Sequence, residues 1–259
     1  MIQDSFDKEG EGIISPARTV RRMAAFVPDA MHTFILTFSH KLVDHLMAEG
    51  IVEQVDERVR LGSASMKAPV FRINGTKIGV LLTITGAATT AASVEELHAL
   101  FGVEKLILFG SCGALTDLPA GRLIVPDAAY RDEGTSYHYA AAADYIEIPG
   151  SRCLQEILEG EGIPYATSRT WTTDAFYRET VRNKEARIRE GCICVEMECA
   201  AVQAVCSFRG IGFYPFLYAA DSLAGSWQNR ILGNTEMDSR VVMFRTAQMI
   251  AEKLTAAKA

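Results

Sequence analysis

The chain has 259 residues, of which 49% are hydrophobic and 22% are charged, and its formal net charge at pH 7 is −6. This composition is typical of a globular protein with a sizeable core, and the acidic balance argues against general nucleic-acid binding. No apolar stretch is long enough to span a membrane, and the acid-rich stretch Met1–Gly12 does not resemble a secretion signal. We therefore expect a cytoplasmic protein with no membrane partner.

Residues 1–30 carry no regular hydrophobic pattern, and we interpret them as an N-terminal arm or lid before a single domain over residues 31–259. After this arm, short apolar runs alternate with stretches of helical spacing. The pair Asn74-Gly75 between two such runs predicts a hairpin. In the first half of the domain we expect strands at Thr33–Phe38, Val70–Ile73, Lys77–Thr83 and Lys105–Phe109, and helices at His40–Glu49 and Ala91–Phe101.

The second half of the chain continues this alternation. Within its last expected strand, Pro215 argues for a bulge or a sheet edge. Strands separated by helices predict an α/β fold: a single domain with a mixed, mostly parallel central sheet flanked by helices. The expected strands are Leu123–Val125, Cys192–Val195 and Gly212–Ala220, and the expected helices are Cys153–Glu159, Arg178–Glu190, Met197–Phe208 and Ser239–Ala257.

Ligands of such sheets bind beyond the carboxyl ends of the strands, so the segments that follow strands are candidate sites. The stretch Thr85–Thr90 (TGAATT) precedes a helix, and its amides either hold an anion or form a tight turn. In Gly110–Ala114 (GSCGA), glycines let a ligand approach Ser111, although a plain turn remains the alternative. The serine is one residue too early for the nucleophile elbow of a hydrolase, so that class is disfavoured.

Acids follow two other expected strands. Glu196 and Glu198 fall at a strand-to-helix junction, where both carboxylates can meet one ligand or can act as first-turn glutamates. Burying them is costly unless something binds them. Asp221 after the last strand is either an acid in a cleft or a helix N-cap. The six cysteines are scattered, and the C-x-C of Cys192 and Cys194 has no matching pair, so we expect no zinc site.

The order and spacing of these segments resemble the nucleoside phosphorylase superfamily, which includes purine nucleoside phosphorylases, uridine phosphorylases and methylthioadenosine nucleosidases. The resemblance runs from about residue 34 to about residue 222. The segments that carry it are GVEKLILFGSCGAL (Gly102–Leu115), TTDAFY, VEMECAA and AADS (within Thr172–Ser222), TGAATTAASVEEL after the hairpin, and RDEGTSYHY (Arg131–Tyr139), which is similar to uridine-phosphorylase-like members.

This resemblance implies an enzyme that cleaves the bond between base and ribose, with inorganic phosphate as co-substrate, no metal and no organic cofactor. It also implies a homo-oligomer, whether a dimer, trimer or hexamer. By resemblance Asp221 is the proton donor to the base, which favours a purine, whereas RDEGTSYHY favours a uridine phosphorylase. The other implied roles are ribose binding by Glu198, Met197 and Glu196, base binding by Phe176, Arg178 and His138, and phosphate binding by Ser111, Gly86 and Thr85.

The chain departs from the family pattern in the segments that are expected to bind phosphate. The loop P-G-D-P-x-R after the first strand is replaced by Ser39–Val43 (SHKLV), and Leu108 stands where a second arginine is expected. Ser111, the amides near Gly86, and Lys41 or His40 remain as donors, and other arginines are candidate substitutes. These candidates are Arg18, Arg21, Arg22, Arg131, Arg178 and Arg182.

Two rival interpretations follow from this departure. If phosphate does not bind, water is the acceptor and the protein is a nucleosidase, but the glutamate-rich G-A-M-x-x-E pattern of nucleosidases is absent after the first strand and only Asp44 is acidic there. A nucleoside-binding protein without catalysis is the second rival. The presence of both Glu198 and Asp221 argues against it, because mere binding has little need of an acid.

Overall fold

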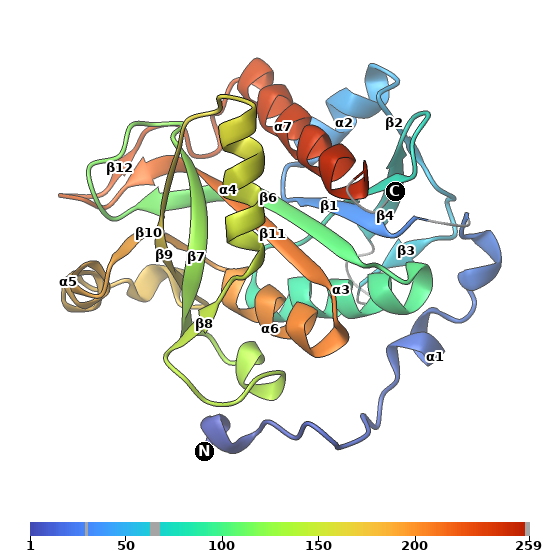
Figure 1. Ribbon diagram of the computed structural model, residues 1–259, viewed down its shortest axis with the longest axis horizontal. Coiled ribbons are helices and arrows are strands. Elements are labelled where there is room, and N and C mark those ends of the chain that lie inside the picture. The colour runs from blue at the N-terminus through green and yellow to red at the C-terminus, as the bar shows by residue number, and fades with distance from the viewer. Residues whose placement is uncertain (29–30, 63–67, 257–259) are drawn as a thin grey trace.

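A single large sheet organises the computed structural model, which describes residues 1–28, 31–62 and 68–256 (Figure 1). The strand order is β12-β11-β7-β9-β10-β6-β1-β5-β4-β2, with β3 paired to β4 and β8 to β7. The strands are β1 Thr33–Thr37, β2 Val52–Gln54, β3 Arg60–Leu61, β4 Ala68–Ile73, β5 Ile78–Leu82, β6 Lys105–Ala114, β7 Leu123–Asp132, β8 Tyr145–Glu147, β9 Tyr165–Thr173, β10 Cys192–Glu196, β11 Gly212–Ser222 and β12 Gln228–Asn229.

Parallel pairing dominates the centre of the sheet, where β5, β1, β6 and β11 run side by side in one direction. The pairing of β4 with β5 is antiparallel, as the Asn74-Gly75 hairpin predicts. Strand β11 also pairs with β7, β7 with β9, β9 with β10, and β10 with β6. These five strands therefore form a closed ring, which gathers the ends of β6, β10 and β11 in one region.

Helices cover both faces of the sheet (Figure 1). Alternate side chains of a strand point to opposite faces, so Leu106 and Leu108 pack toward α3 and α6, while Ile107 packs toward α2, α4 and α7. Gly102 closes α3 in a left-handed conformation (φ 61°), which glycine adopts without strain. The α-helices are α1 Pro16–Val20, α2 His40–Ala48, α3 Ala87–Phe101, α4 Gly150–Gly160, α5 Val181–Arg189, α6 Cys199–Arg209 and α7 Met237–Ala256, and the 3₁₀ turns are η1 Ile2–Asp4, η2 Ala24–Phe26, η3 Thr135–His138 and η4 Phe176–Arg178.

The expected α/β fold with a mixed sheet is confirmed, and the expected elements differ from the observed ones mainly at their ends. The short elements α1, β2, β3, β8 and β12 were not expected. Strand β9 was not expected, because YATSRTWTT has no apolar run. The helix expected from Arg178 begins only at Val181, where the side chain of Thr180 caps it. Pro215 lies in the half of β11 that pairs with β6 alone, and the irregularity of register comes later, between Ala219 and Asp221.

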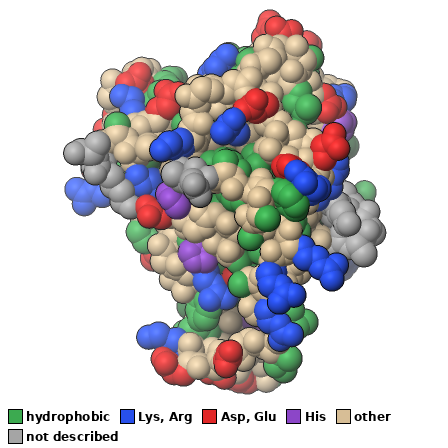
Figure 2. All heavy atoms as spheres, turned by 90° about the vertical axis from the view of Figure 1, so that its right-hand side faces the viewer, with side chains coloured by type: hydrophobic (Ala, Val, Ile, Leu, Met, Phe, Trp, Pro, Cys, Tyr) green, Lys and Arg blue, Asp and Glu red, His purple; other side chains and the backbone are tan. Residues whose placement is uncertain are grey.

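The N-terminal arm runs along α3 and η3, at the bottom of Figure 1. Figure 2 views the molecule from the side and shows the arm standing out below the body, with a narrowing between them. None of the described residues 1–28 lines the cleft that the strand ends form. Within the described part of the chain, no helix is long and apolar enough to cross a membrane.

Candidate active site

The four predicted strand-end segments meet at one cleft. Its inner cavity has a volume of about 310 Å³. Glu198 from the β10–α6 junction and Asp221 from β11 both line this cavity, as do Ser111 from β6 and Thr85 before α3. Met197 and Phe176, predicted to contact sugar and base, line it as well. These residues lie far apart in the sequence. They were selected because ligands of such sheets bind beyond the carboxyl ends of the strands, and the fold places them around one cavity.

Glu196 holds the strand-to-helix junction together from inside. Its Oε2 accepts hydrogen bonds from the backbone N–H groups of Glu198 and Cys199, both at 2.7 Å. Its Oε1 accepts from the hydroxyls of Thr172 and Thr170. An ionised carboxylate has about four acceptor sites, and the protein fills all of them here. The family resemblance implies ribose binding by Glu196, whereas these hydrogen bonds within the protein fit a residue that supports the site.

Backbone N–H groups hold the side chain of Glu198 in place. The N–H of Gly86 donates to its Oε1 at 2.6 Å, and Gly86 can present this amide because it adopts a positive φ of 115°. Glu198 is only 6% exposed. Burial and the charge of Glu196 raise the pKa of Glu198 to about 8, against the two backbone hydrogen bonds that favour its ionised form. The side chain lines the inner cavity.

The raised pKa of Glu198 predicts a pH-dependent stability. Because the folded carboxyl binds a proton more tightly than the unfolded one, whose ordinary value is 4.5, stability falls as pH rises from about 4.5 through about 8. Glu198→Gln, which cannot titrate, removes this contribution. Above about pH 8 we expect the variant to melt about 2–4 °C higher than wild type, the shift that ~1 kcal/mol produces in a chain of this size. Thermal unfolding across this pH range measures it, and parallel curves for the two proteins would contradict it.

Asp221 lies inside strand β11 and is 5% exposed, so it is not the N-cap of a helix. The indole Nε1–H of Trp227 donates to its Oδ2 at 2.8 Å. A guanidinium N–H of Arg230 donates to its backbone oxygen at 3.0 Å and fixes the strand at this point. The carboxyl group is thus oriented by one side-chain donor and lines the same cavity as Glu198.

A second cavity of about 370 Å³ adjoins the first, and Thr85 and Ser111 line both. Its basic residues are His40, Lys41 and Arg240, and none of the described residues that line it is an acid. Arg240 reaches over from α7, where its guanidinium donates to Ser39 Oγ at 2.7 Å and to the backbone oxygen of Thr235 at 2.9 Å. It also donates to the backbone oxygen of Gly233 at 3.4 Å, so two of its five N–H groups lie beyond these three hydrogen bonds. The inner cavity has the opposite character, because the described residues that line it include four acids and no Lys or Arg.

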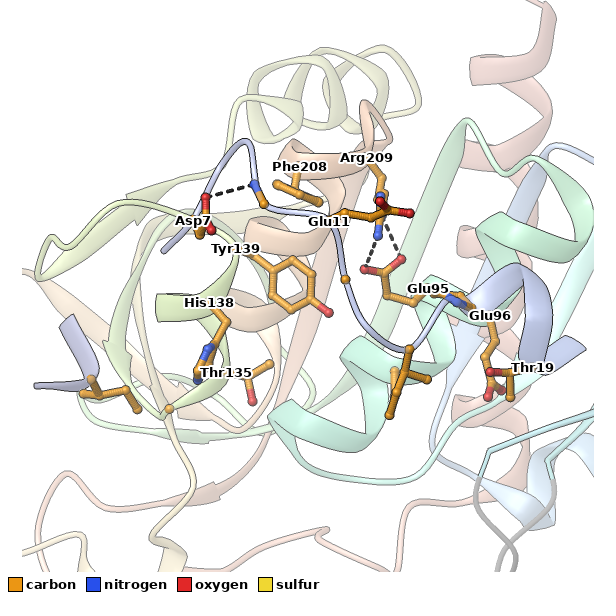
Figure 3. Close-up of a pocket in the computed structure, with 17 residues that line it drawn as sticks. Asp7, Glu11, Thr19, Glu95, Glu96, Thr135, His138, Tyr139, Phe208 and Arg209 are labelled. Carbon is orange, nitrogen blue, oxygen red and sulfur yellow. Dashed lines mark hydrogen bonds and ion pairs between the residues drawn. The ribbon is translucent and has the colours of Figure 1, made fainter. Parts of the chain in front are cut away.

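Three predicted site residues have contacts or positions that differ from those expected. The amide of Gly86 serves Glu198 and is therefore not a phosphate donor in this structure. Arg178 is exposed and lines neither cavity. His138 lies on η3 in a separate pocket between the arm, α3 and α6, beside Tyr139 and Thr135 (Figure 3). The family resemblance implies that Arg178 and His138 bind the base, and within one chain the structure does not bring either residue to the cleft.

The basic residues that line the cleft also differ from those predicted. Leu108, at the position of one lost arginine, is fully buried in the core. None of the six candidate arginines lines the cleft, whereas Arg240 and Glu179 line it, Trp227 donates to Asp221, and none of these three was predicted. Arg240 lies on the helix α7, and Trp227 lies in the loop after β11 but beyond the predicted segment that ends at Ser222, so the search of strand ends does not select them. No group of three His, Cys, Asp or Glu residues suited to a metal ion occurs among residues 1–28, 31–62 and 68–256.

The ring of strands and the polarised cleft define a nucleoside phosphorylase-like α/β protein. The chain belongs to the phosphorylase superfamily, whose family model matches residues 35–255. A guanosine phosphorylase of Halorubrum lacusprofundi is 30% identical over 142 residues, 53% of this chain and 58% of that protein. A DeoD-type purine nucleoside phosphorylase of Alkaliphilus metalliredigens is 28% identical over 153 residues, 58% of this chain and 66% of that protein. The chain thus matches less than two thirds of the length of these curated relatives.

Among solved structures, the AMP nucleosidase of Bacteroides thetaiotaomicron superimposes with a TM-score of 0.70. The match covers 94% of this chain and 99% of that one at 19% sequence identity. At this identity the likeness establishes the shared fold, and the fold does not by itself assign a substrate.

Proposed function

We propose that the protein cleaves the N-glycosidic bond of a purine nucleoside with inorganic phosphate, giving the free base and ribose 1-phosphate. The observation that carries this proposal is the charge polarisation of the cleft. An acidic cavity suits a sugar that becomes cationic in the transition state, and the adjoining basic cavity suits the attacking anion. The two meet at Thr85 and Ser111, where the anion and the sugar would be in contact.

The chemistry assigns a role to each end of the cleft. The bond between the anomeric carbon and the base nitrogen breaks, and its electron pair moves into the purine ring. Asp221 donates a proton to the imidazole part of the base, which neutralises the departing charge. Glu198 accepts hydrogen bonds from the two vicinal hydroxyls of the ribose, and Phe176 stacks on the base. A phosphate oxygen, held by Ser111 and the basic cavity, then forms the new bond to the anomeric carbon.

Arg240 is the proposed replacement for the arginines that the family pattern places at phosphate. Arg240→Met keeps much of the side-chain volume and removes the charge. The Michaelis constant for phosphate should therefore rise by tenfold or more, because a lost charge-assisted hydrogen bond costs about 1.5–3 kcal/mol. The Michaelis constant for the nucleoside should change little. Initial rates of base release at varied phosphate and fixed nucleoside measure both constants.

Arg245→Met is the matched control, because Arg245 lies on the same helix, is exposed and donates only to the nearby Gln248. It should leave both constants unchanged. Equal effects of the two substitutions, or a rise confined to the nucleoside constant in Arg240→Met, would argue against a phosphate at Arg240.

A phosphate-independent nucleosidase is the second candidate function. The burial of Leu108 at the place of a phosphate arginine favours it, because the core offers no cation there. Water would then attack the anomeric carbon and the product would be free ribose. Dependence of base release on added phosphate separates the two functions.

A further inference from the structure

Glu179 is an acid of the cleft that neither the strand-end rule nor the proposed reaction uses. It follows the 3₁₀ turn η4, three residues after Phe176. Residues three apart eclipse each other in a 3₁₀ turn, and both Phe176 and Glu179 line the inner cavity, whereas Tyr177 between them is 92% exposed. The turn therefore presents an aromatic ring and a carboxyl group together on the side that faces Asp221.

No cation neutralises Glu179. It is half-buried, and no hydrogen bond or ion pair joins it to another residue in the described parts of the chain. Lys184 on the neighbouring helix α5 donates its Nζ–H to the backbone oxygen of Leu223 at 2.8 Å instead. The titratable groups that line the cavity from the other elements are all acids or a thiol, namely Asp221 on β11, Glu196 and Glu198 at the β10–α6 junction, and Cys112 on β6.

Burial and the charge of Asp221 raise the pKa of Glu179 to about 7. Near neutral pH this carboxyl group is therefore present in both forms. The ionised form only accepts hydrogen bonds, whereas the protonated form also donates one. A group with this property can distinguish ligand atoms by whether they donate or accept.

A purine carries two polar groups side by side on one edge: the N7 nitrogen and the substituent on carbon 6, which is an amino donor in adenine and an oxo acceptor in guanine and hypoxanthine. We propose that Glu179 is a specificity-determining residue that contacts the group on carbon 6 of a purine whose N7 faces Asp221. This inference rests on the proposed function, because it requires a purine in the inner cavity. Ionised Glu179 accepts from a 6-amino group, and protonated Glu179 donates to a 6-oxo group.

The inference predicts a substrate preference that changes with pH. From about pH 6 to about pH 8, the ionised fraction of a group that titrates near 7 rises about tenfold. The ratio of kcat/KM for adenosine to that for inosine should therefore rise at least tenfold over this range. Taking the ratio removes the titration of Glu198, which acts on the ribose of both substrates. Glu179→Gln can donate and accept at every pH, so its ratio should stay constant.

The test measures this ratio against pH for wild type, Glu179→Gln and the control Glu185→Gln, whose exposed side chain on α5 lies outside the cleft. Calorimetric binding of adenine and hypoxanthine in the presence of phosphate gives a second readout that does not require turnover. A pH-dependent ratio in wild type and Glu185→Gln, lost in Glu179→Gln, supports the inference. A ratio that is the same at all pH values in all three proteins overturns it while leaving the proposed function intact. Absence of both turnover and binding of any purine overturns the proposed function and the inference together.

Discussion

Asp221→Asn is expected to lower kcat for inosine and adenosine by about 100- to 1,000-fold, the range of a lost general acid, while KM changes little. The asparagine keeps the shape of the aspartate and can still accept the hydrogen bond from Trp227. It cannot deliver a proton to the departing base. Because binding of the ground state does not need that proton, the loss should fall on the chemical step.

A substrate that needs no proton isolates this role. A purine nucleoside methylated at N7 already carries a positive charge on the imidazole ring, so its base departs as a neutral molecule. Asp221→Asn should cleave such a substrate at nearly the wild-type rate. The control Asp127→Asn, an exposed position on β7, should behave as wild type on all substrates. An equal loss of activity on the methylated and unmethylated nucleosides would show that Asp221 is not the proton donor.

Above about pH 8, where Glu198 is ionised, Glu198→Gln is expected to lower kcat/KM by about 100-fold or more. The reason is that two charge-assisted hydrogen bonds to the ribose, each worth about 1.5–3 kcal/mol, are weakened together. The glutamine oxygen can still accept from the Gly86 amide, but its NH₂ group cannot accept from a hydroxyl. KM should rise and kcat should fall, since the hydroxyls of the sugar are held in both the ground state and the transition state.

The ribose hydroxyls provide the control within the substrate. A 2′-deoxynucleoside lacks one of the two donors. Glu198→Gln should therefore lower kcat/KM for the deoxynucleoside by a smaller factor than for the ribonucleoside. The preference of the enzyme for ribose over deoxyribose should therefore shrink in the variant. Steady-state kinetics with adenosine and 2′-deoxyadenosine measure this. Losses of equal size on both sugars would place Glu198 away from the 2′-hydroxyl.

The fold and much of the cleft could be predicted from the sequence because both follow from local patterns. Continuous apolar runs mark the strands buried on both faces, and the segments after them carry Ser111, Glu198 and Asp221. The closure of the ring then brings these ends together. Strand β9 could not be predicted because its buried side chains include hydroxyls rather than an apolar run. The structure shows why they are buried: Thr170 and Thr172 donate hydrogen bonds to Glu196.

The residues that sequence reasoning missed are those whose position depends on long-range packing. Arg240 meets Ser39 across a separation of 201 residues, and nothing in the sequence around either one indicates the contact. Glu179 enters the cleft only because the helix starts at Val181 and leaves a 3₁₀ turn before it. His138 was misplaced for a similar reason, since η3 packs beside the arm and α3 rather than beside the strand ends.

Product analysis with and without phosphate tests the central claim, that an anion and a purine nucleoside react across the junction of the two cavities. Phosphorus NMR of a reaction with inosine or adenosine should reveal ribose 1-phosphate in an amount equal to the free base, and base release should stop when phosphate is omitted. Base release that continues at the same rate without phosphate, with free ribose as the product, would contradict this account.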